Sequence, residues 1–203
     1  MKIVIENQIF SPVCVYTEMM KSDEIIIEKC DNYQKRTFRN RFSLVSPQGL
    51  VYFSIPLKKG KNSQKFVEVE ISYENKWIRS LSNAMRSYYS SSPFFHHYFD
   101  KIIEIFVRQE NRLFELNSSF RELVFELLEI EKPVSFTSEY MKNIYDENLM
   151  DLREKYLPVN KAEINLNTKP YPQVYEDKLG FVSNASILDM LFNVGKSSIL
   201  YLK

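Results

Sequence analysis

Four cations stand within seven residues of one short stretch, CDNYQKRTFRNRF, which runs from Cys30 to Phe42. The cations are Lys35, Arg36, Arg39 and Arg41. Two amide side chains accompany them: Gln34 before the first cation and Asn40 between the last two. Guanidinium and ammonium groups bind phosphate and carboxylate oxygens through charge-assisted hydrogen bonds. The stretch therefore predicts an anion-binding face. The structural alternative is a solvated strand edge, on which cations discourage pairing with another sheet.

A strand over residues 38–45 would divide these side chains between two faces. Arg39 and Arg41 would then share one face, about 7 Å apart along the strand, with Lys35 nearby. This spacing suits a phosphate or a carboxylate. We expect Lys35, Arg39 and Arg41 to bind anionic oxygens, and Gln34 and Asn40 to orient the substrate or the arginines.

A second polar group lies near the C-terminus. Ser186, Asp189 and Asn193 are spaced by three and four residues, which places them on one face of a helix. Asp and Asn are poor helix formers inside a helix, so the stripe is either solvated or lines a cleft. We interpret Asp189 as the candidate general base, with Asn193 holding it. A structural pair between Asp189 and a hairpin arginine is the alternative.

Histidine and cysteine chemistry is less strongly indicated. His96 and His97 are adjacent, so on a helix they diverge by about 100° and do not point at one metal ion. His96 and Asp100 share a face, but two ligands do not make a zinc site. Cys30 lies near Lys29, which favours a lowered thiol pKa, but no partner base is evident. We expect no metal site here.

Composition excludes several classes of protein. The chain has 203 residues and a formal net charge of +1, which does not suggest nucleic-acid binding. With four glycines it has no glycine-rich phosphate loop, and with two cysteines no disulfide framework. No apolar run approaches the roughly 20 residues of a membrane span, and the first ten residues do not resemble a secretory signal. We therefore expect a cytoplasmic protein. Its cofactor and oligomeric state are not indicated.

The first half of the chain predicts mostly strands. KIVIENQIF and EIIIEKC read as strands around a short helix in VYTEMMKSD, the pattern of a parallel βαβ unit. TFRNRFSLV and LVYFSIPL read as a hairpin, and SPQG supplies its turn. FVEVEIS alternates apolar and acidic residues, which predicts a further strand.

The second half predicts mostly helices. One begins near Trp77, and two more follow the break at residues 90–93. VSFTSEY reads as a strand, ENLMDLREKYL as a short amphipathic helix and residues 158–175 as a long loop. A last helix in SNASILDMLFNVG has Asn184 or Ser186 as its N-cap and Gly195 at its end. The sequence thus predicts a single α/β domain over residues 1–203. A mixed sheet would come from the N-terminal half, with helices of the C-terminal half packed against it.

Four segments together resemble the WbqC-like family of bacterial proteins, in the variant found in Bacteroides-type bacteria. They are YQKRTFRNR, VEISYENKWIRSLSNAMRSYYSSSPFF, LFELN, and YPQVY with GFVSNASILDMLFNVG. The family pattern includes Gln34, Lys35, Asn40, Arg41, Tyr89, Asp189 and Asn193. This implies that the hairpin and the last helix share a site, and it adds Tyr89 to the substrate-binding residues. The segment FSPVCVYTEMM matches the pattern only loosely.

The resemblance implies a role in surface polysaccharide (O-antigen) biosynthesis. The implied activity is that of a transferase, which would modify a nucleotide-linked or phosphorylated sugar by acyl or aminoacyl transfer. The partner would be a small anionic substrate. The alternative is a non-catalytic scaffold whose arginine-rich face binds an acidic partner. Convergence of Arg39, Arg41 and Asp189 on one cleft would favour the enzyme.

Overall fold

The chain begins with the predicted parallel βαβ unit. The computed structural model describes residues 1–58, 64–142, 146–158, 168–183 and 185–203. Strand β1 (Lys2–Glu6) is followed by helix α1 (Val13–Lys21) and strand β2 (Glu24–Glu28). The two strands pair in parallel, with Lys2 opposite Glu24 and Glu6 opposite Glu28. The β-branched residues of both strands favour this pairing, because they pack well on a pleated surface.

Two more strands extend this sheet, and both come from the second half of the chain. β5 (Val134–Phe136) pairs with β2, and β6 (Leu149–Asp151) pairs with β1. The order is β5-β2-β1-β6 and every pair is parallel. All four carboxyl ends therefore lie on the same edge of the sheet. The α/β class and the strand in VSFTSEY are confirmed.

The helix predicted in ENLMDLREKYL is wrong, because part of that segment is β6. Three residues are enough for the ladder: Leu149 and Met150 lie opposite Lys2 and Ile3, and the Leu152 N–H donates to the Val4 carbonyl at 2.8 Å. Leu152, an apolar residue of that segment, is fully buried. Sheet pairing, which the local pattern does not show, determined the conformation.

The arginine-rich stretch leads into a separate antiparallel hairpin, β3 (Arg41–Ser46) and β4 (Gly49–Ser54). The predicted turn is confirmed, and Gly49 takes the positive φ of 108° that the turn needs. The strand begins at Arg41, so residues 38–40 precede it. The strands thus form two sheets rather than one mixed sheet. The strand predicted in FVEVEIS is also wrong: Phe66–Glu68 form a 3-10 turn, η1, followed by isolated bridges at Glu70 and Ile71.

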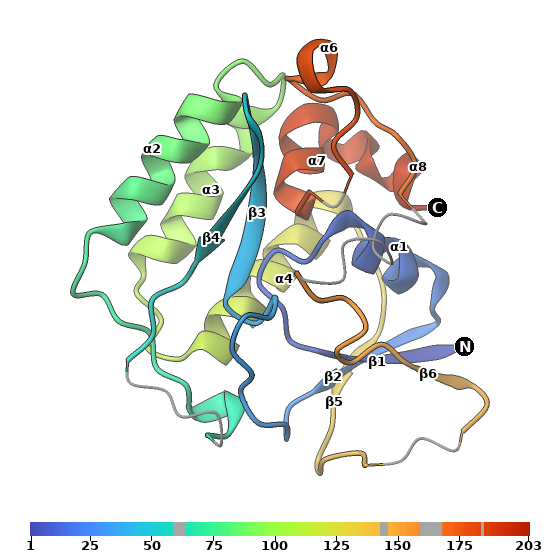
Figure 1. Cartoon of the computed structure of the whole chain (residues 1–203). Coiled ribbons are helices and arrows are strands. Elements are labelled where there is room, and N and C mark those ends of the chain that lie inside the picture. Colours follow the sequence, from blue (N-terminus) through green and yellow to red (C-terminus); the bar gives the residue numbers. More distant parts are fainter. Residues whose placement is uncertain (59–63, 143–145, 159–167, 184) are drawn as a thin grey trace.

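Three long helices pack beside the hairpin (Figure 1). They are α2 (Trp77–Tyr89), α3 (Phe95–Val107) and α4 (Leu113–Leu128). Phe10, which follows β1, meets Phe120 of α4 with ring centroids 4.3 Å apart, and Phe120 meets Phe106 of α3 at 4.5 Å. These buried rings join the sheet to the helices. No helix in the described parts of the chain is long and apolar enough to cross a membrane.

The C-terminal segment closes the fold above the sheet with α6 (Glu176–Leu179), α7 (Ile187–Val194), the short turn η3 (Gly195–Ser197) and α8 (Ser198–Leu202). Every residue of α7 is buried, and the helix packs against α1, α3 and β3. Ser186 occupies the N-cap position, but its hydroxyl donates to the Ser43 carbonyl at 2.6 Å and makes no cap bond. Asn184 lies outside the described residues. Gly195 ends α7 with a φ of 58°, as predicted.

Candidate functional site

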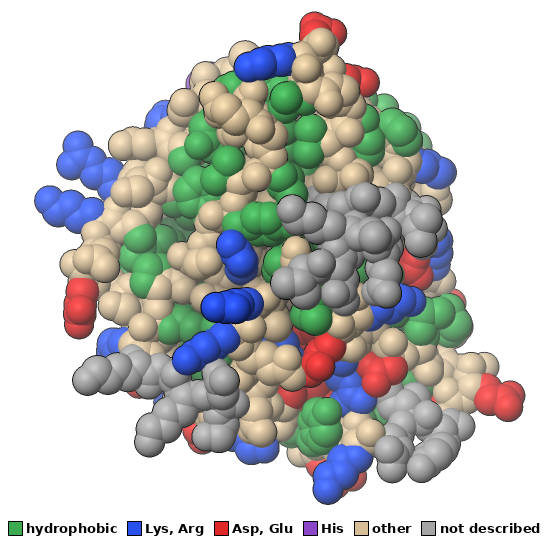
Figure 2. Space-filling view, in the orientation of Figure 1, with side chains coloured by type: hydrophobic (Ala, Val, Ile, Leu, Met, Phe, Trp, Pro, Cys, Tyr) green, Lys and Arg blue, Asp and Glu red, His purple; other side chains and the backbone are tan. Residues whose placement is uncertain are grey.

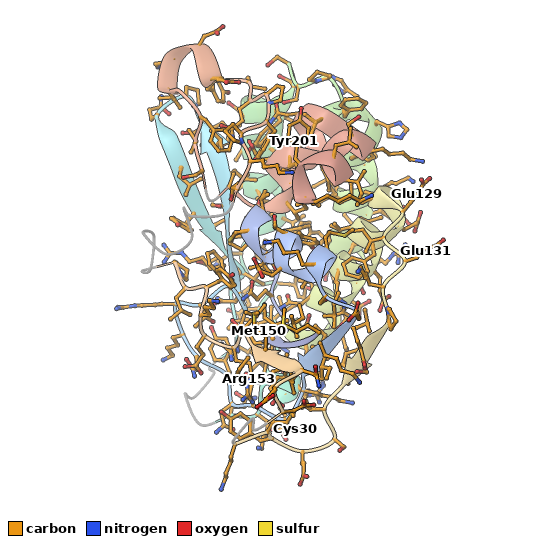
Figure 3. The ribbon with its side chains drawn as sticks, turned by 90° about the vertical axis from the view of Figure 1, so that its right-hand side faces the viewer. Cys30, Glu129, Glu131, Met150, Arg153 and Tyr201 are labelled. Atoms are coloured by element: carbon orange, nitrogen blue, oxygen red, sulfur yellow. The ribbon has the colours of Figure 1, made fainter. Side chains whose placement is uncertain are left out.

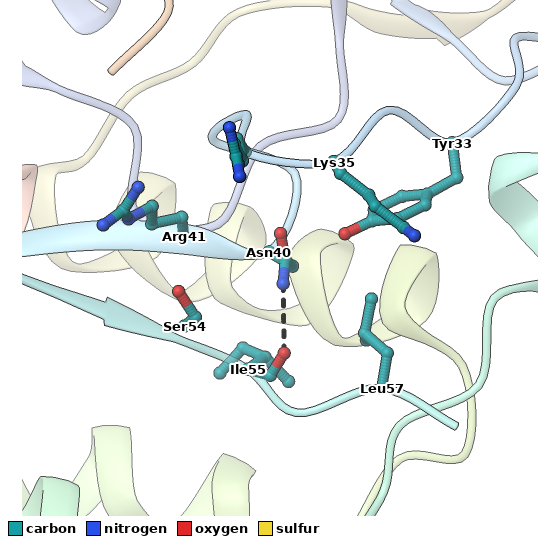
Figure 4. Close-up of a pocket in the computed structure, with 8 residues that line it drawn as sticks. Tyr33, Lys35, Asn40, Arg41, Ser54, Ile55 and Leu57 are labelled. Atoms are coloured by element: carbon teal, nitrogen blue, oxygen red, sulfur yellow. Dashed lines mark hydrogen bonds between the residues drawn. The ribbon is translucent and has the colours of Figure 1, made fainter. Parts of the chain in front are cut away.

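A pocket of about 340 Å³ lies where the arginine-rich stretch enters the hairpin (Figure 4). We call it the cationic pocket. Its lining residues come from the stretch before β3 and from the end of β4: Tyr33, Lys35, Arg36, Asn40, Arg41, Ser54, Ile55 and Leu57. Figure 2 shows Lys and Arg side chains gathered beside the hairpin on this face. Within the described residues, no carboxylate forms an ion pair with the three pocket cations.

Contacts in the walls of the cationic pocket hold the side chains of Asn40 and Arg41 in fixed positions. The Asn40 amide donates to the Ile55 carbonyl at 3.1 Å, which ties the stretch to the strand that leaves the hairpin. The Arg41 guanidinium lies 4.7 Å from the centroid of the Tyr52 ring, a cation–π contact. Its Nε is buried and has no partner. An oriented guanidinium with unused donors is suited to binding an anion.

A second pocket, of about 360 Å³, lies at the carboxyl ends of the parallel strands. We call it the carboxyl-edge pocket. Its lining comes from the segments that follow β2, β5 and β6, together with Lys65 just before η1: Cys30, Asp31, Asn32, Gln34, Lys65, Tyr140, Lys142 and Glu154. Figure 3 shows Cys30 and Arg153 together at this end of the sheet. The carboxyl edge is where open α/β sheets bind their ligands.

Buried charges lie at this edge of the sheet. Glu28 is fully buried and accepts from the Arg153 guanidinium at 2.9 Å and from the Thr137 hydroxyl at 2.6 Å. Glu6 is 1% exposed and accepts from the Gln8 amide at 2.7 Å. Glu6 and Glu28 thus have the hydrogen-bonding partners that burial of a charge requires.

Asp31 is the exception among these carboxylates. One of its oxygens accepts from the Arg39 guanidinium, while the other, Oδ1, is buried and has no hydrogen-bond partner. Burial raises the pKa of Asp31 to about 6, and Glu6 and Glu28 act in the same direction against the lowering effect of Arg39. Asp31 is therefore an incompletely satisfied carboxyl group in the wall of a pocket.

Asp189 lies in a separate buried network, which we call the Asp189 network. The hydroxyl of Tyr89 donates to its Oδ1 at 2.8 Å, and that of Tyr171 to its Oδ2 at 2.7 Å. The Gln173 amide also donates to Oδ2, at 2.8 Å. The Tyr89 oxygen in turn accepts from the Val45 N–H at 2.7 Å. The carboxyl thus joins α7 to α2, to β3 and to the segment before α6.

Burial dominates the titration behaviour of the Asp189 network. It raises the pKa of Asp189, although the three donors act in the opposite direction. It also raises the pKa values of Tyr89 and Tyr171 far above their ordinary range, and the adjacent carboxylate adds to this effect. Both hydroxyl groups therefore stay protonated and act as donors to the carboxyl group.

The predicted site residues are divided among three places. Lys35, Asn40 and Arg41 line the cationic pocket together. Gln34 lines the carboxyl-edge pocket, where its amide donates to Glu154, and Arg39 is 1% exposed and paired with Asp31. Tyr89, Asp189 and Asn193 lie in or beside the Asp189 network.

The predicted geometry of the shared site is therefore corrected in two respects. Arg39 does not face the same side as Arg41, because residues 38–40 precede the strand and do not alternate with it. Asp189 is 1% exposed and does not line the cationic pocket. Asn193 lies next to Asp189, as predicted, but its amide donates to the Asp189 backbone carbonyl at 2.8 Å rather than to the carboxyl group. His96 and His97 are exposed on α3.

Sequence reasoning missed several of the pocket residues. Arg36 was among the four cations but received no role, and it lines the cationic pocket. Asp31 and Glu154 received none either, although Asp31 lies three residues after the end of β2. The rule that parallel strands place ligand-binding residues after their carboxyl ends would have indicated Asp31. No local signal indicated Glu154, because β6 was interpreted as a helix.

Comparison with known proteins agrees with the resemblance in the motifs. The model of the WbqC-like protein family matches residues 9–157. A relative described as the uncharacterized protein Rv1507c, from Mycobacterium tuberculosis, is 26% identical over 204 residues, which cover 89% of this chain and 88% of the relative. No solved structure matches the chain. The family match includes the cationic pocket and the carboxyl ends of β2, β5 and β6, and the chain belongs to the WbqC-like protein family.

Proposed function

We propose that this protein is a cytoplasmic transferase that binds a nucleotide-linked or phosphorylated sugar during surface polysaccharide biosynthesis. The observation that carries the proposal is the cationic pocket, in which Lys35, Arg36 and Arg41 line one hollow of about 340 Å³. A pocket of this volume suits a small ligand. The three cations suit the phosphate groups of that ligand, and the Asn40 amide is held in place by the Ile55 carbonyl.

The pocket favours a small molecule over the scaffold alternative. An acidic protein partner needs an extended surface, whereas these cations line a hollow at the end of the hairpin. Lys35 and Arg36 are exposed and Arg41 is half-buried, so a ligand can reach all three. The acyl or aminoacyl transfer in the proposal comes from the family resemblance alone.

Asp189 serves this proposal better as a structural group than as the general base. A base must come within hydrogen-bond reach of the proton that it removes. Both oxygens of Asp189 already accept from buried donors, and the residue is 1% exposed. Its role is to attach α7 to the hairpin that carries Arg41.

Calorimetric titration with pyrophosphate and with UDP-glucose tests the proposal. We expect binding of both, and binding weaker by roughly tenfold to a hundredfold after Arg41→Ala, because a charged hydrogen bond contributes about 1.5–3 kcal/mol. Arg79→Ala is the matched control, since Arg79 is an exposed cation on α2 outside the pocket. Equal affinity in wild type and Arg41→Ala, or no binding of either compound, would overturn the proposal.

A further inference from the structure

The proposed function assigns no role to the carboxyl-edge pocket. The carboxyl-edge pocket lies on the other side of the segment that precedes β3. In this segment Tyr33 and Lys35 line the cationic pocket, while Asn32 and Gln34 line the carboxyl-edge pocket. This alternation is what an extended segment produces. The chain between β2 and β3 thus forms a wall with a different pocket on each side.

The wall of the carboxyl-edge pocket contains an unused hydrogen-bond acceptor. Asp31 is 6% exposed and lines the pocket, and no group bonds to its Oδ1. A buried polar atom without a partner is unusual in a folded protein and calls for an explanation. A carboxylate oxygen accepts hydrogen bonds, so the group that would satisfy it is a donor.

The charges behind the pocket indicate what kind of donor this is. Three carboxylates, Glu6, Glu28 and Asp31, are buried at this edge, and two guanidiniums, Arg39 and Arg153, accompany them. Arg39 pairs with Asp31 and Arg153 with Glu28, while Glu6 has no ion pair within the described residues. Burial of a charge without full compensation is costly. A cation that reaches Asp31 would add compensating positive charge and would also satisfy Oδ1.

We propose that the carboxyl-edge pocket binds the primary ammonium group of a small polar molecule, with Asp31 Oδ1 as its acceptor. Two kinds of molecule supply this group: an amino sugar and an amino acid. The rim carries Glu154, Lys65 and Lys142, so both signs of charge are available for the rest of the ligand. Burial is the main cause of the raised pKa of Asp31, and a second cation beside the Arg39 guanidinium would lower it.

This inference deepens the proposed function and rests on it for the reaction. The acyl or aminoacyl transfer named there involves an amine, and the carboxyl-edge pocket would hold the compound that carries this amine in its protonated form. The binding itself is independent of the cationic pocket, so the two proposals can fail separately.

Calorimetric titration of the full chain with glucosamine, glucose and free glycine tests the inference. Glucose has the same ring as glucosamine without the amine, and glycine has the amine without the ring. We expect at least one of the two amines to bind, and glucose to bind roughly tenfold more weakly than glucosamine if the amino sugar is the ligand. Preference for glycine would identify the amino-acid source. Failure of both amines to bind, or equal binding of glucose and glucosamine without binding of glycine, would overturn the inference.

Asp31→Asn removes the charge with little change of shape, and we expect it to weaken binding of the preferred amine by tenfold or more. Asp100→Asn, at an exposed acid on α3, is the matched control. Pyrophosphate binding to the folded Asp31→Asn variant should persist, which separates this inference from the proposed function. Unchanged amine affinity in this variant would refute the role of Asp31.

Because Arg39 loses its partner in Asp31→Asn, that variant could fail to fold. The ¹³C resonance of the Asp31 carboxyl carbon in the wild-type protein gives an independent measurement. It should shift when the amine saturates its site. An unchanged resonance at saturation would place the amine elsewhere and overturn the inference.

Discussion

Replacement of Asp189 by Asn distinguishes a structural carboxyl group from a catalytic one. The change removes a charge and replaces one acceptor oxygen by an NH₂ donor. Three buried donors point at this carboxyl group: the hydroxyls of Tyr89 and Tyr171 and the amide of Gln173. An asparagine cannot accept from all three, so at least one donor loses its acceptor.

The less costly orientation of the new amide sets the magnitude. If the NH₂ group replaces Oδ1, it can donate to the Tyr89 oxygen, and only the Tyr89 hydroxyl hydrogen loses its acceptor. If it replaces Oδ2, both Tyr171 and Gln173 lose theirs. One unsatisfied buried donor costs about 1–3 kcal/mol. We therefore expect Asp189→Asn to lower the free energy of unfolding by about 1–3 kcal/mol.

Urea unfolding followed by circular dichroism measures this loss as a lower transition midpoint with an unchanged m value. Asp100→Asn is the control, and an exposed substitution of this kind should change stability by no more than about 0.5 kcal/mol. Pyrophosphate binding in the folded variant should stay close to that of the wild type, since Asp189 does not line the cationic pocket. Unchanged stability together with complete loss of turnover would refute this reasoning and restore Asp189 as the base.

Three further predictions concern stability, each measured by urea unfolding. Burial raises the pKa of Asp31 from 3.8 to about 6, so the native state binds more protons than the unfolded chain between these values. The free energy of unfolding should therefore fall as the pH rises through this window, and Asp31→Asn should remove that slope; a slope of the opposite sign would contradict this. Gly195→Ala should cost about 1–2 kcal/mol through the positive φ alone, and its Cβ would lie 2.7 Å from Phe94 Cδ1; stability equal to wild type would show that the turn relaxes. Phe120→Ala should cost about 3–5 kcal/mol, because the ring is 1% exposed and packs against Phe10 and Phe106; a loss below about 1 kcal/mol would contradict this packing.

Local patterns predicted the elements whose conformation depends on nearby residues. The βαβ unit, the hairpin turn, the long helices and the Gly195 stop all follow from periodicity and turn chemistry. Two segments were predicted as the wrong kind of element, ENLMDLREKYL and FVEVEIS, and both errors have the same physical cause. β6 and η1 take their conformation from backbone partners far away in the chain: β6 pairs with β1, and the segment after η1 forms bridges with Leu57 and Arg112. A period of apolar residues does not show such partners.

The same limit explains the outcome at the site. The sequence identified the cationic stretch, and Lys35, Asn40 and Arg41 do line one pocket. Which face each arginine takes depends on where the strand begins, and β3 begins two residues after Arg39. The polar residues of the last helix were predicted to be solvated or to line a cleft. They are instead buried, and Asp189 accepts from two tyrosines and an amide of other segments, which spacing alone does not indicate.

Arg39 and Asp189 together show how a polar residue near a site can act without contact with a ligand. Arg39 pairs with Asp31, and its backbone carbonyl accepts from the Asn117 amide of α4 at 2.8 Å. These contacts fix one end of the wall between the two pockets. Asp189 holds the hairpin from the other side, through Tyr89 and the Val45 N–H. Neither residue lines the cationic pocket, so both buried groups stabilise the fold around that pocket rather than contact its ligand.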